Sequence, residues 1–245
     1  MKKTFLVFLI VLGLVFSTVL ATTYVVGTSA DFPPFEYVQN GKYVGFDLGL
    51  IKAIAKTEGF NIQIRDMAFD SLIPALKVGV IDIAIAGMTI TKEREKVVDF
   101  SNPYWFADQD MIVRKNSNYT VTVLFGKHKI GVQTGTTGDL WVTKNLVKSG
   151  ILKASNVKRY QSFIYALEAL LNGAIDAVVL DSPVAERFAQ VKPVKVVAVL
   201  VTGEHYGIAV RKGNTKLLRE INAGLKKVKA SGEMAKLIDK YFGKK

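Results

Sequence analysis

The sequence has no cysteine among its 245 residues. This absence excludes disulfide bonds, thiolate metal ligands and a cysteine nucleophile. It also excludes anchoring through a lipid on an N-terminal cysteine. Histidine is scarce too, since only His128 and His205 occur and neither lies in a candidate site segment. Histidine-based acid–base chemistry therefore has little support, although carboxylates could still serve as bases.

Acidic residues are few relative to basic ones, with 21 Asp and Glu against 33 Lys and Arg, which gives a formal net charge of +12. A basic excess raises the question of a nucleic-acid partner. The lysines are nevertheless spread along the chain, with only short clusters such as 226–229. We interpret the charge as a solvated basic surface and expect no nucleic-acid partner.

Long hydrophobic runs are missing except at the N-terminus, where residues 4–20 are almost entirely apolar. Lys2 and Lys3 precede this run and Ala21 ends it, a layout typical of a secretory signal peptide. A retained membrane anchor is the alternative, because about 17–25 apolar residues can span a bilayer. The run is short and polar chain follows it, so we predict a cleaved signal peptide at 1–21 and a protein of the periplasm or extracytoplasmic space.

The remaining chain alternates between predicted strands and helices. Apolar spacing predicts strands at 24–28, 61–66, 80–86, 129–132, 157–160, 177–180 and 194–201, and helices at 47–59, 71–77, 138–149, 163–172, 183–190 and within 217–241. A hairpin is expected over 37–45, with Asn40 and Gly41 at its turn. Strand–helix alternation is the sequence form of a parallel α/β sheet, and it occurs once in each half of the chain.

The two halves are joined by extended segments at 109–115 and 206–211. If the chain crosses between two lobes in both segments, they would together form a hinge. The predicted division places 22–108 and 208–245 in a discontinuous first lobe and 109–207 in a second lobe.

A polar segment follows the predicted strand at 80–86. Ligands of open α/β sheets bind beyond the carboxyl ends of the strands. Gly87 would leave its carbonyl approachable, Thr89 offers a hydroxyl, and the guanidinium of Arg94 could hold a carboxylate through two parallel hydrogen bonds. Alternatively, Arg94 pairs with Glu93 or Asp99 on a solvated helix.

The loop at 131–139 is rich in glycine and threonine and lies between a predicted strand and a helix. Free backbone N–H groups and the helix dipole make such a loop a site for anions. It lacks the lysine of a P-loop and the dinucleotide fingerprint, so a carboxylate fits better than a nucleotide. A plain capped turn is the alternative.

Asp181 directly follows the apolar strand predicted at 177–180. A carboxylate in that position could receive an ammonium group and keep its charge through the pairing. The alternative is that Asp181 caps the helix that begins at Pro183. Aromatic residues could complete the wall of a site, because Phe32 and Phe69 lie outside regular apolar patterns, although such residues often belong to a core.

The order of these segments resembles the polar amino-acid-binding proteins of ABC importers, known as solute-binding protein family 3. The resemblance rests on residues 29–36, 45–48, 69–76, 87–94, 100–104 and 133–137. It extends from about Tyr24 to the C-terminus. It implies an α/β type II periplasmic binding protein fold, in which two Rossmann-like lobes joined by a two-strand hinge close over the ligand.

The resemblance also implies roles for single residues. The position of Arg94 grips the α-carboxylate of an amino acid, helped by the backbone at Thr137 and the hydroxyl of Thr89. The position of Asp181 and the carbonyl of Gly87 receive the α-ammonium group.

The side chain of the substrate would pack against Phe32 and Phe69. Many members that bind basic amino acids or glutamine carry an acid where this chain has Ser29. A cationic side chain would then need Asp31 or Glu36 instead, and Glu36 is our candidate. The predicted ligand-binding residues are Asp31, Phe32, Glu36, Phe69, Gly87, Met88, Thr89, Arg94, Gln133, Thr136, Thr137 and Asp181.

We therefore expect a monomeric solute-binding protein that is not an enzyme and needs no cofactor or metal. It would capture a free polar amino acid, with arginine or another basic amino acid ahead of glutamine, and deliver it to an ABC transporter permease. Two alternatives stay open: an exported enzyme on the same fold, similar to cyclohexadienyl dehydratase, and a ligand-sensing domain for a receptor.

Overall fold

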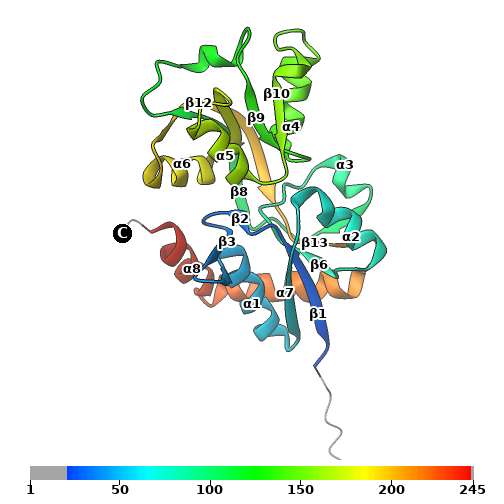
Figure 1. Ribbon diagram of the computed structural model, residues 1–245. Coiled ribbons are helices and arrows are strands. Elements are labelled where there is room, and N and C mark those ends of the chain that lie inside the picture. The colour runs from blue at the N-terminus through cyan, green and yellow to red at the C-terminus, as the bar shows by residue number, and fades with distance from the viewer. Residues whose placement is uncertain (1–20, 244–245) are drawn as a thin grey trace, which may run out of the picture.

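Two five-stranded sheets organise residues 21–243, the part of the chain that the computed structural model describes (Figure 1). The signal peptide predicted at 1–21 lies outside these residues, apart from Ala21. None of the helices in the described range is both long enough and apolar enough to cross a membrane.

The first lobe is built on a sheet with the strand order β5-β1-β6-β13-β7. Its strands are β1 (Thr23–Thr28), β5 (Asn61–Asp66), β6 (Ile83–Ala84), β7 (Val98–Phe100) and β13 (Ala209–Arg211). Its helices are α1 (Phe46–Glu58), α2 (Leu72–Val78), α3 (Lys92–Glu95), α7 (Thr215–Ala230) and α8 (Glu233–Phe242), with a 3-10 turn at Phe69–Ser71. The C-terminal helices, orange and red in Figure 1, therefore return to the blue and cyan N-terminal elements, and α1 packs against both.

A small sheet of β2 (Asp31–Phe32), β3 (Glu36–Gln39) and β4 (Lys42–Val44) completes this lobe. It confirms the predicted hairpin, because β3 pairs with β4 and the turn residues Asn40 and Gly41 have φ of 52° and 71°. Both values are left-handed, a conformation that asparagine and glycine tolerate better than other residues.

The second lobe, green and yellow in Figure 1, has the strand order β10-β9-β11-β8-β12. Its strands are β8 (Trp105–Arg114), β9 (Ile130–Gln133), β10 (Val157–Tyr160), β11 (Ala177–Asp181) and β12 (Val194–Tyr206). Its helices are α4 (Thr137–Val142), continued by a π-helical turn at Thr143–Val147, α5 (Phe163–Leu171) and α6 (Ser182–Val191), with 3-10 turns at Val121–Leu124 and Ala154–Asn156.

Both sheets are mixed, whereas the alternation of strands and helices predicted parallel sheets. In the second lobe β8 runs antiparallel to β11 and β12, and in the first lobe β13 runs antiparallel to β6 and β7. The physical reason is the double crossing of the chain. Parallel neighbours need a crossover connection, but β8 enters the second lobe and β12 leaves it, so these two strands pair in opposite directions.

The paired crossing strands join the two lobes. Trp105 lies opposite Tyr206, and Ala107 lies opposite Glu204, where β8 and β12 leave the second sheet. The segment at 109–113, part of the expected hinge, pairs with β11 inside the second sheet. The predicted lobe boundaries at 108/109 and 207/208 fall within β8 and just after β12, and they stay a prediction.

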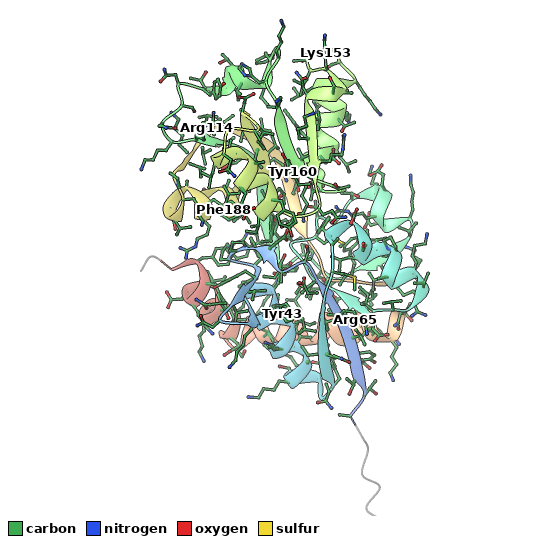
Figure 2. The ribbon with its side chains drawn as sticks, viewed as in Figure 1. Tyr43, Arg65, Arg114, Lys153, Tyr160 and Phe188 are labelled. Atoms are coloured by element: carbon green, nitrogen blue, oxygen red, sulfur yellow. The ribbon has the colours of Figure 1, made fainter. Side chains whose placement is uncertain are left out.

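Charged side chains cover both lobes. Figure 2 shows the exposed Arg65 in the lower lobe and the exposed Lys153 at the top of the upper lobe.

Candidate functional site

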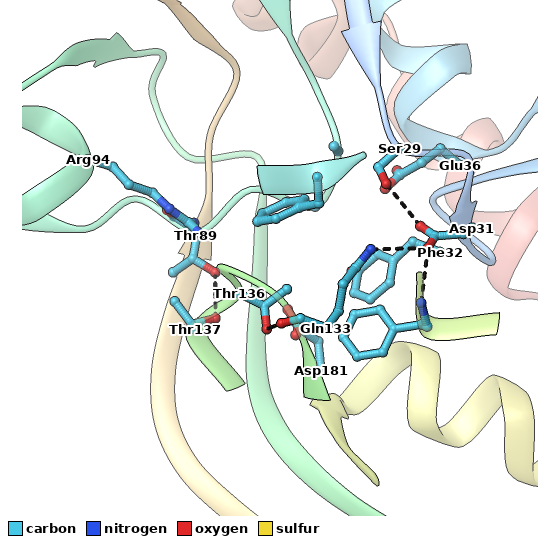
Figure 3. A pocket seen from close by; sticks show the side chains of 14 residues that line it. Ser29, Asp31, Phe32, Glu36, Thr89, Arg94, Gln133, Thr136, Thr137 and Asp181 are labelled. Atoms are coloured by element: carbon cyan, nitrogen blue, oxygen red, sulfur yellow. Dashed lines mark hydrogen bonds between the residues drawn. The ribbon is translucent and has the colours of Figure 1, made fainter. Parts of the chain in front are cut away.

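A cavity of about 290 Å³ lies between the lobes, where loops from both sheets meet (Figure 3). It is lined by Ser29, Asp31, Phe32, Glu36, Phe69, Ala86, Gly87, Thr89, Arg94, Gln133, Thr136, Thr137, Phe163 and Asp181. Polar, charged and aromatic side chains from both lobes converge on it, the composition usual for a small-molecule site.

All predicted ligand-binding residues except Met88 line this cavity. The side chain of Met88 is fully buried in an apolar group with Leu72 and Leu76. Its side chain therefore packs inside the first lobe, whereas its neighbours Gly87 and Thr89 line the cavity.

Arg94 lies at the start of α3, which Thr91 caps by accepting the Arg94 N–H at 3.2 Å. Its guanidinium donates to the carbonyl of Thr89 at 2.7 Å and to the carbonyl of Gly135, on the other lobe, at 3.1 Å. Burial lowers the pKa of Arg94 to about 10, although Glu204 and Asp181 oppose this shift. The group is still a cation at neutral pH.

The alternative surface role of Arg94 is wrong. Asp99 instead forms an ion pair with Lys212 at 2.7 Å. The Arg94 side chain lies over the ring of Phe69, with 5.2 Å between the guanidinium carbon and the ring centroid. A planar cation held between an aromatic face and the cavity can present its N–H groups to an anion.

Asp181 ends β11 and is the residue before α6, but its side chain makes no capping hydrogen bond. Its carboxylate accepts instead from the amide of Gln109 at 2.8 Å and from the hydroxyl of Tyr206. Burial, followed by the charge of Glu204, raises the pKa of Asp181 to about 7. The capping alternative is therefore wrong, and the carboxylate is held in place at the cavity wall.

Gly87 is constrained by its surroundings. Its φ of 53° is left-handed, and a Cβ added there would lie 2.7 Å from a ring carbon of Phe32. Its N–H donates to Asp47 at 2.8 Å. A glycine at this position lets the chain turn tightly beside the aromatic ring.

Glu36 is fully buried, and neither of its carboxyl oxygens has a hydrogen-bond partner. Burial, followed by the charge of Asp47, raises the pKa of Glu36 well above its ordinary value. Burial likewise raises the pKa of Asp47 to about 6. The surroundings therefore disfavour the ionised form of Glu36, whose protonated carboxyl can donate to Asp47, whereas a cation in the cavity would favour ionisation.

Asp31 connects the two lobes rather than standing free. Its carboxylate accepts from the amide of Gln133 at 3.1 Å, from the N–H of Phe163 at 3.0 Å and from the hydroxyl of Ser29 at 3.1 Å. Burial raises its pKa despite these bonds. Gln133 and Phe163 belong to the second lobe, so Asp31 contributes to the closed arrangement.

The glycine-rich loop forms the capped turn that its sequence allowed, and its role as an anion site stays a prediction. Thr136 caps α4 by accepting the N–H of Asp139 at 3.2 Å, and it donates to the carbonyl of Gln133 at 2.8 Å. Both polar functions of the Thr136 hydroxyl are therefore used within the loop. Thr137, the first residue of α4, faces the cavity at the helix N-terminus.

Phe163 is a cavity residue that the sequence did not indicate. Its ring stacks on Phe32 of the other lobe, with 5.3 Å between centroids and 27° between planes. As the first residue of an apolar helix, it carries no local signal that separates it from core residues. Ser29, noted only as a departure from the family pattern, and Ala86 also line the cavity.

The cavity thus combines a buried cation with buried carboxyl groups and aromatic walls. No group of histidine, cysteine or acidic residues suited to hold a metal ion occurs in the described range. Neither histidine lines the cavity. Two lobes closing over such a bipolar cavity define a binding protein for a small zwitterion.

The chain belongs to the bacterial extracellular solute-binding proteins, family 3. The sequence model of this family matches residues 24–244. This family consists of binding proteins, so the protein is not an enzyme. A probable histidine-binding protein of Neisseria gonorrhoeae is 38% identical over 90% of this chain and 83% of its own length. ABC transporter arginine-binding protein 1 of Escherichia coli is 37% identical over 88% of this chain and 89% of its own.

Solved structures give the same result. A mutant of ArgBP from T. maritima superimposes with a TM-score of 0.84 at 45% identity, covering 91% of this chain and 96% of its own. An ancestral arginine-binding protein bound to glutamine has a TM-score of 0.83 at 44% identity, covering 92% and 100%. The same ancestral type bound to arginine reaches 0.83 at 45% identity, covering 90% and 98%.

Proposed function

We propose that this protein captures a free L-amino acid between its lobes and, once closed, presents it to the permease of an ABC transporter. The observation that carries the proposal is one cavity in which the guanidinium of Arg94 and the carboxylate of Asp181 are both buried. An α-amino acid carries the complementary charges on two groups attached to the same carbon. Burial of such charges is tolerable only where each is paired and hydrogen-bonded.

In this proposal Arg94 receives the α-carboxylate, together with the backbone at Thr137 on the N-terminus of α4. Asp181 and the carbonyl of Gly87 receive the α-ammonium group. Arg94 extends from the first lobe and Asp181 from the second. A ligand held by both residues favours the closed state over the open one by its differential affinity for the two.

The side chain of the ligand would lie toward Glu36, beside Phe32 and Phe163. An unpartnered, buried carboxyl is costly by itself, and a cationic side chain would repay that cost by pairing with it. Arginine or another basic amino acid is therefore the first candidate, and glutamine is second. The names of the similar proteins, which mention arginine, histidine and bound glutamine, support this order.

The proposal includes export through a cleaved signal peptide at 1–21, action in the periplasm or extracytoplasmic space, and a monomeric protein. Relatives described as extracellular or as components of ABC transporters support this part of the proposal.

A thermal-shift screen of the twenty amino acids tests the proposal. A ligand that binds only the folded protein raises its stability by RT ln(1 + [L]/Kd). We expect arginine to raise the melting temperature most, followed by the other basic amino acids and glutamine. The proposal fails if no amino acid raises the melting temperature of the wild-type protein.

A further inference from the structure

Glu204 is a buried carboxylate on β12 that lies behind the cavity without lining it. One of its oxygens, Oε2, accepts the hydroxyl of Thr89 at 2.7 Å and the hydroxyl of Thr137 at 2.7 Å. Its other oxygen accepts the amide of Gln109 at 3.2 Å. Thr89 belongs to the first lobe and Thr137 to the second, so one hinge residue holds a side chain from each.

These contacts fix the direction of two hydrogen bonds. An ionised carboxylate can only accept, and a threonine hydroxyl has a single hydrogen to donate. The two hydroxyls lie 3.4 Å from each other but only 2.7 Å from Glu204, so the shorter contacts direct both hydrogens to Glu204. The threonines line the cavity, and there they can offer only lone pairs.

We propose that Glu204 is a positioning residue that makes the hydroxyls of Thr89 and Thr137 acceptors for the ammonium group of the ligand. This inference rests on the proposed function and refines it, because the Thr89 hydroxyl then assists Asp181 rather than Arg94. A hydroxyl whose hydrogen is already donated accepts from an ammonium group but offers nothing to a carboxylate.

Gln109 extends the same arrangement to Asp181. Its amide nitrogen donates to Asp181 at 2.8 Å and lies within hydrogen-bond distance of Glu204, at 3.2 Å, and of the Thr137 hydroxyl, at 3.3 Å, while its amide oxygen has no partner. Two carboxylates thus hold the nitrogen of Gln109 toward Asp181. Removal of Glu204 would free the amide of Gln109 to rotate. At the ammonium end of the cavity, both the threonine hydroxyls and the amide that holds Asp181 would then lose their fixed orientation.

The test compares ligands that differ only at the α-carbon. Affinities of wild type, Glu204→Ala and Glu204→Gln are measured by calorimetry for L-arginine and for its desamino analogue, in which hydrogen replaces the α-ammonium group. The same measurements with L-glutamine and its desamino analogue provide a second pair. Competition against a bound amino acid extends the range for weak analogues.

We expect Glu204→Ala to weaken binding of the amino acid about tenfold, the effect of one charge-assisted hydrogen bond. Binding of the desamino analogue should change less than about twofold. Glu204→Gln should recover part of the loss, because its amide oxygen still accepts from the hydroxyls. Equal weakening of both ligands, or no weakening of either, would overturn the proposal.

Asp108→Ala is the matched control. Asp108 also lies in the crossing strands, where it accepts the N–H groups of Thr202 at 2.7 Å and Gly203 at 2.8 Å, but it does not line the cavity. A general disturbance of the hinge should weaken binding of the amino acid and of its desamino analogue equally. Wild-type protein that binds no amino acid would instead overturn the proposed function, and this role with it.

Discussion

Asp181 and Glu36 are both fully enclosed acids that line the same cavity, yet their surroundings differ. Asp181 accepts hydrogen bonds from Gln109 and Tyr206, whereas neither oxygen of Glu36 has a partner. Donors around Asp181 favour its charged form, and their absence around Glu36 favours the neutral form. One end of the cavity is therefore organised in advance, while the other end depends on what enters it.

This contrast corresponds to the two parts of an amino acid. The α-carboxylate and α-ammonium groups are common to all amino acids, so a fixed arrangement of Arg94 and Asp181 can serve any of them. The side chain varies, and a carboxyl that ionises only beside a cation can discriminate between ligands. The comparison leads to four predictions, with the largest expected effect first.

Replacement of Arg94 by alanine should remove the group that binds the α-carboxylate at the preorganised end of the cavity. We expect binding of every amino acid to weaken by about 2–5 kcal/mol, because the α-carboxylate would be buried without its partner. Calorimetry measures the loss. Arg65→Ala, which removes an exposed guanidinium bonded to the carbonyl of Val80, is the control. Near-normal affinity in the Arg94 variant would contradict the proposed role of Arg94 in holding the α-carboxylate.

Glu36→Gln should separate ligands by charge. An amide cannot pair with a cation as a carboxylate does, so arginine should bind about 10- to 100-fold more weakly, in line with ~1.5–3 kcal/mol for a charged hydrogen bond. Glutamine should be much less affected. Glu168→Gln, on exposed helix surface, is the control. An equal loss of affinity for arginine and glutamine would show that Glu36 does not discriminate between charged and neutral side chains.

Binding should weaken as the pH falls through about 7. The pKa of Asp181 is raised to about 7, and its charged form is the one that pairs with ammonium, so protonation competes with the ligand. One such group reduces affinity by up to about tenfold per pH unit below its pKa. Arginine should show the steeper dependence, because it also ionises Glu36. Calorimetry in buffers of different ionisation enthalpy should detect proton release, and its absence would contradict this link.

Met88→Leu should have the smallest effect. Met88 is fully buried away from the cavity, and an exchange of similar volume usually costs less than about 1.5 kcal/mol of stability. We expect a small fall in melting temperature and an affinity within about twofold of wild type. A larger change in affinity would show that Met88 does contribute to ligand binding.

Much of the local structure followed from residue patterns. Helix α1 ends at Gly59, which has a φ of 77° and donates to the carbonyl of Ala55, as expected of a glycine after an amphipathic helix. The hairpin at Asn40 and Gly41 has an equally local cause. Strand β6 is shorter than its apolar run, because pairing partners rather than hydrophobicity decide where a ladder ends.

Strand direction and several site residues could not be predicted in this way. The antiparallel direction of β8 and β13 results from the double crossing of the chain between the lobes. A pattern of a few neighbouring residues cannot predict such a crossing. Phe163 and Glu204 have no local feature that marks them as part of a site. Their positions depend on where distant strands place them.

Asp181 and Glu36 show the same division. The sequence by itself determined that each acid lies next to a strand. Strands and turns are predicted from the spacing of apolar residues and from turn residues, and both are patterns of neighbouring residues. Only the tertiary structure decided what opposes the rise in pKa that burial causes in each acid. The donors that hold Asp181 come from residues 72 and 25 positions away, and Glu36 meets Asp47 rather than a donor. Burial and hydrogen bonding between distant segments set the pKa values, and these exist only once the chain has folded.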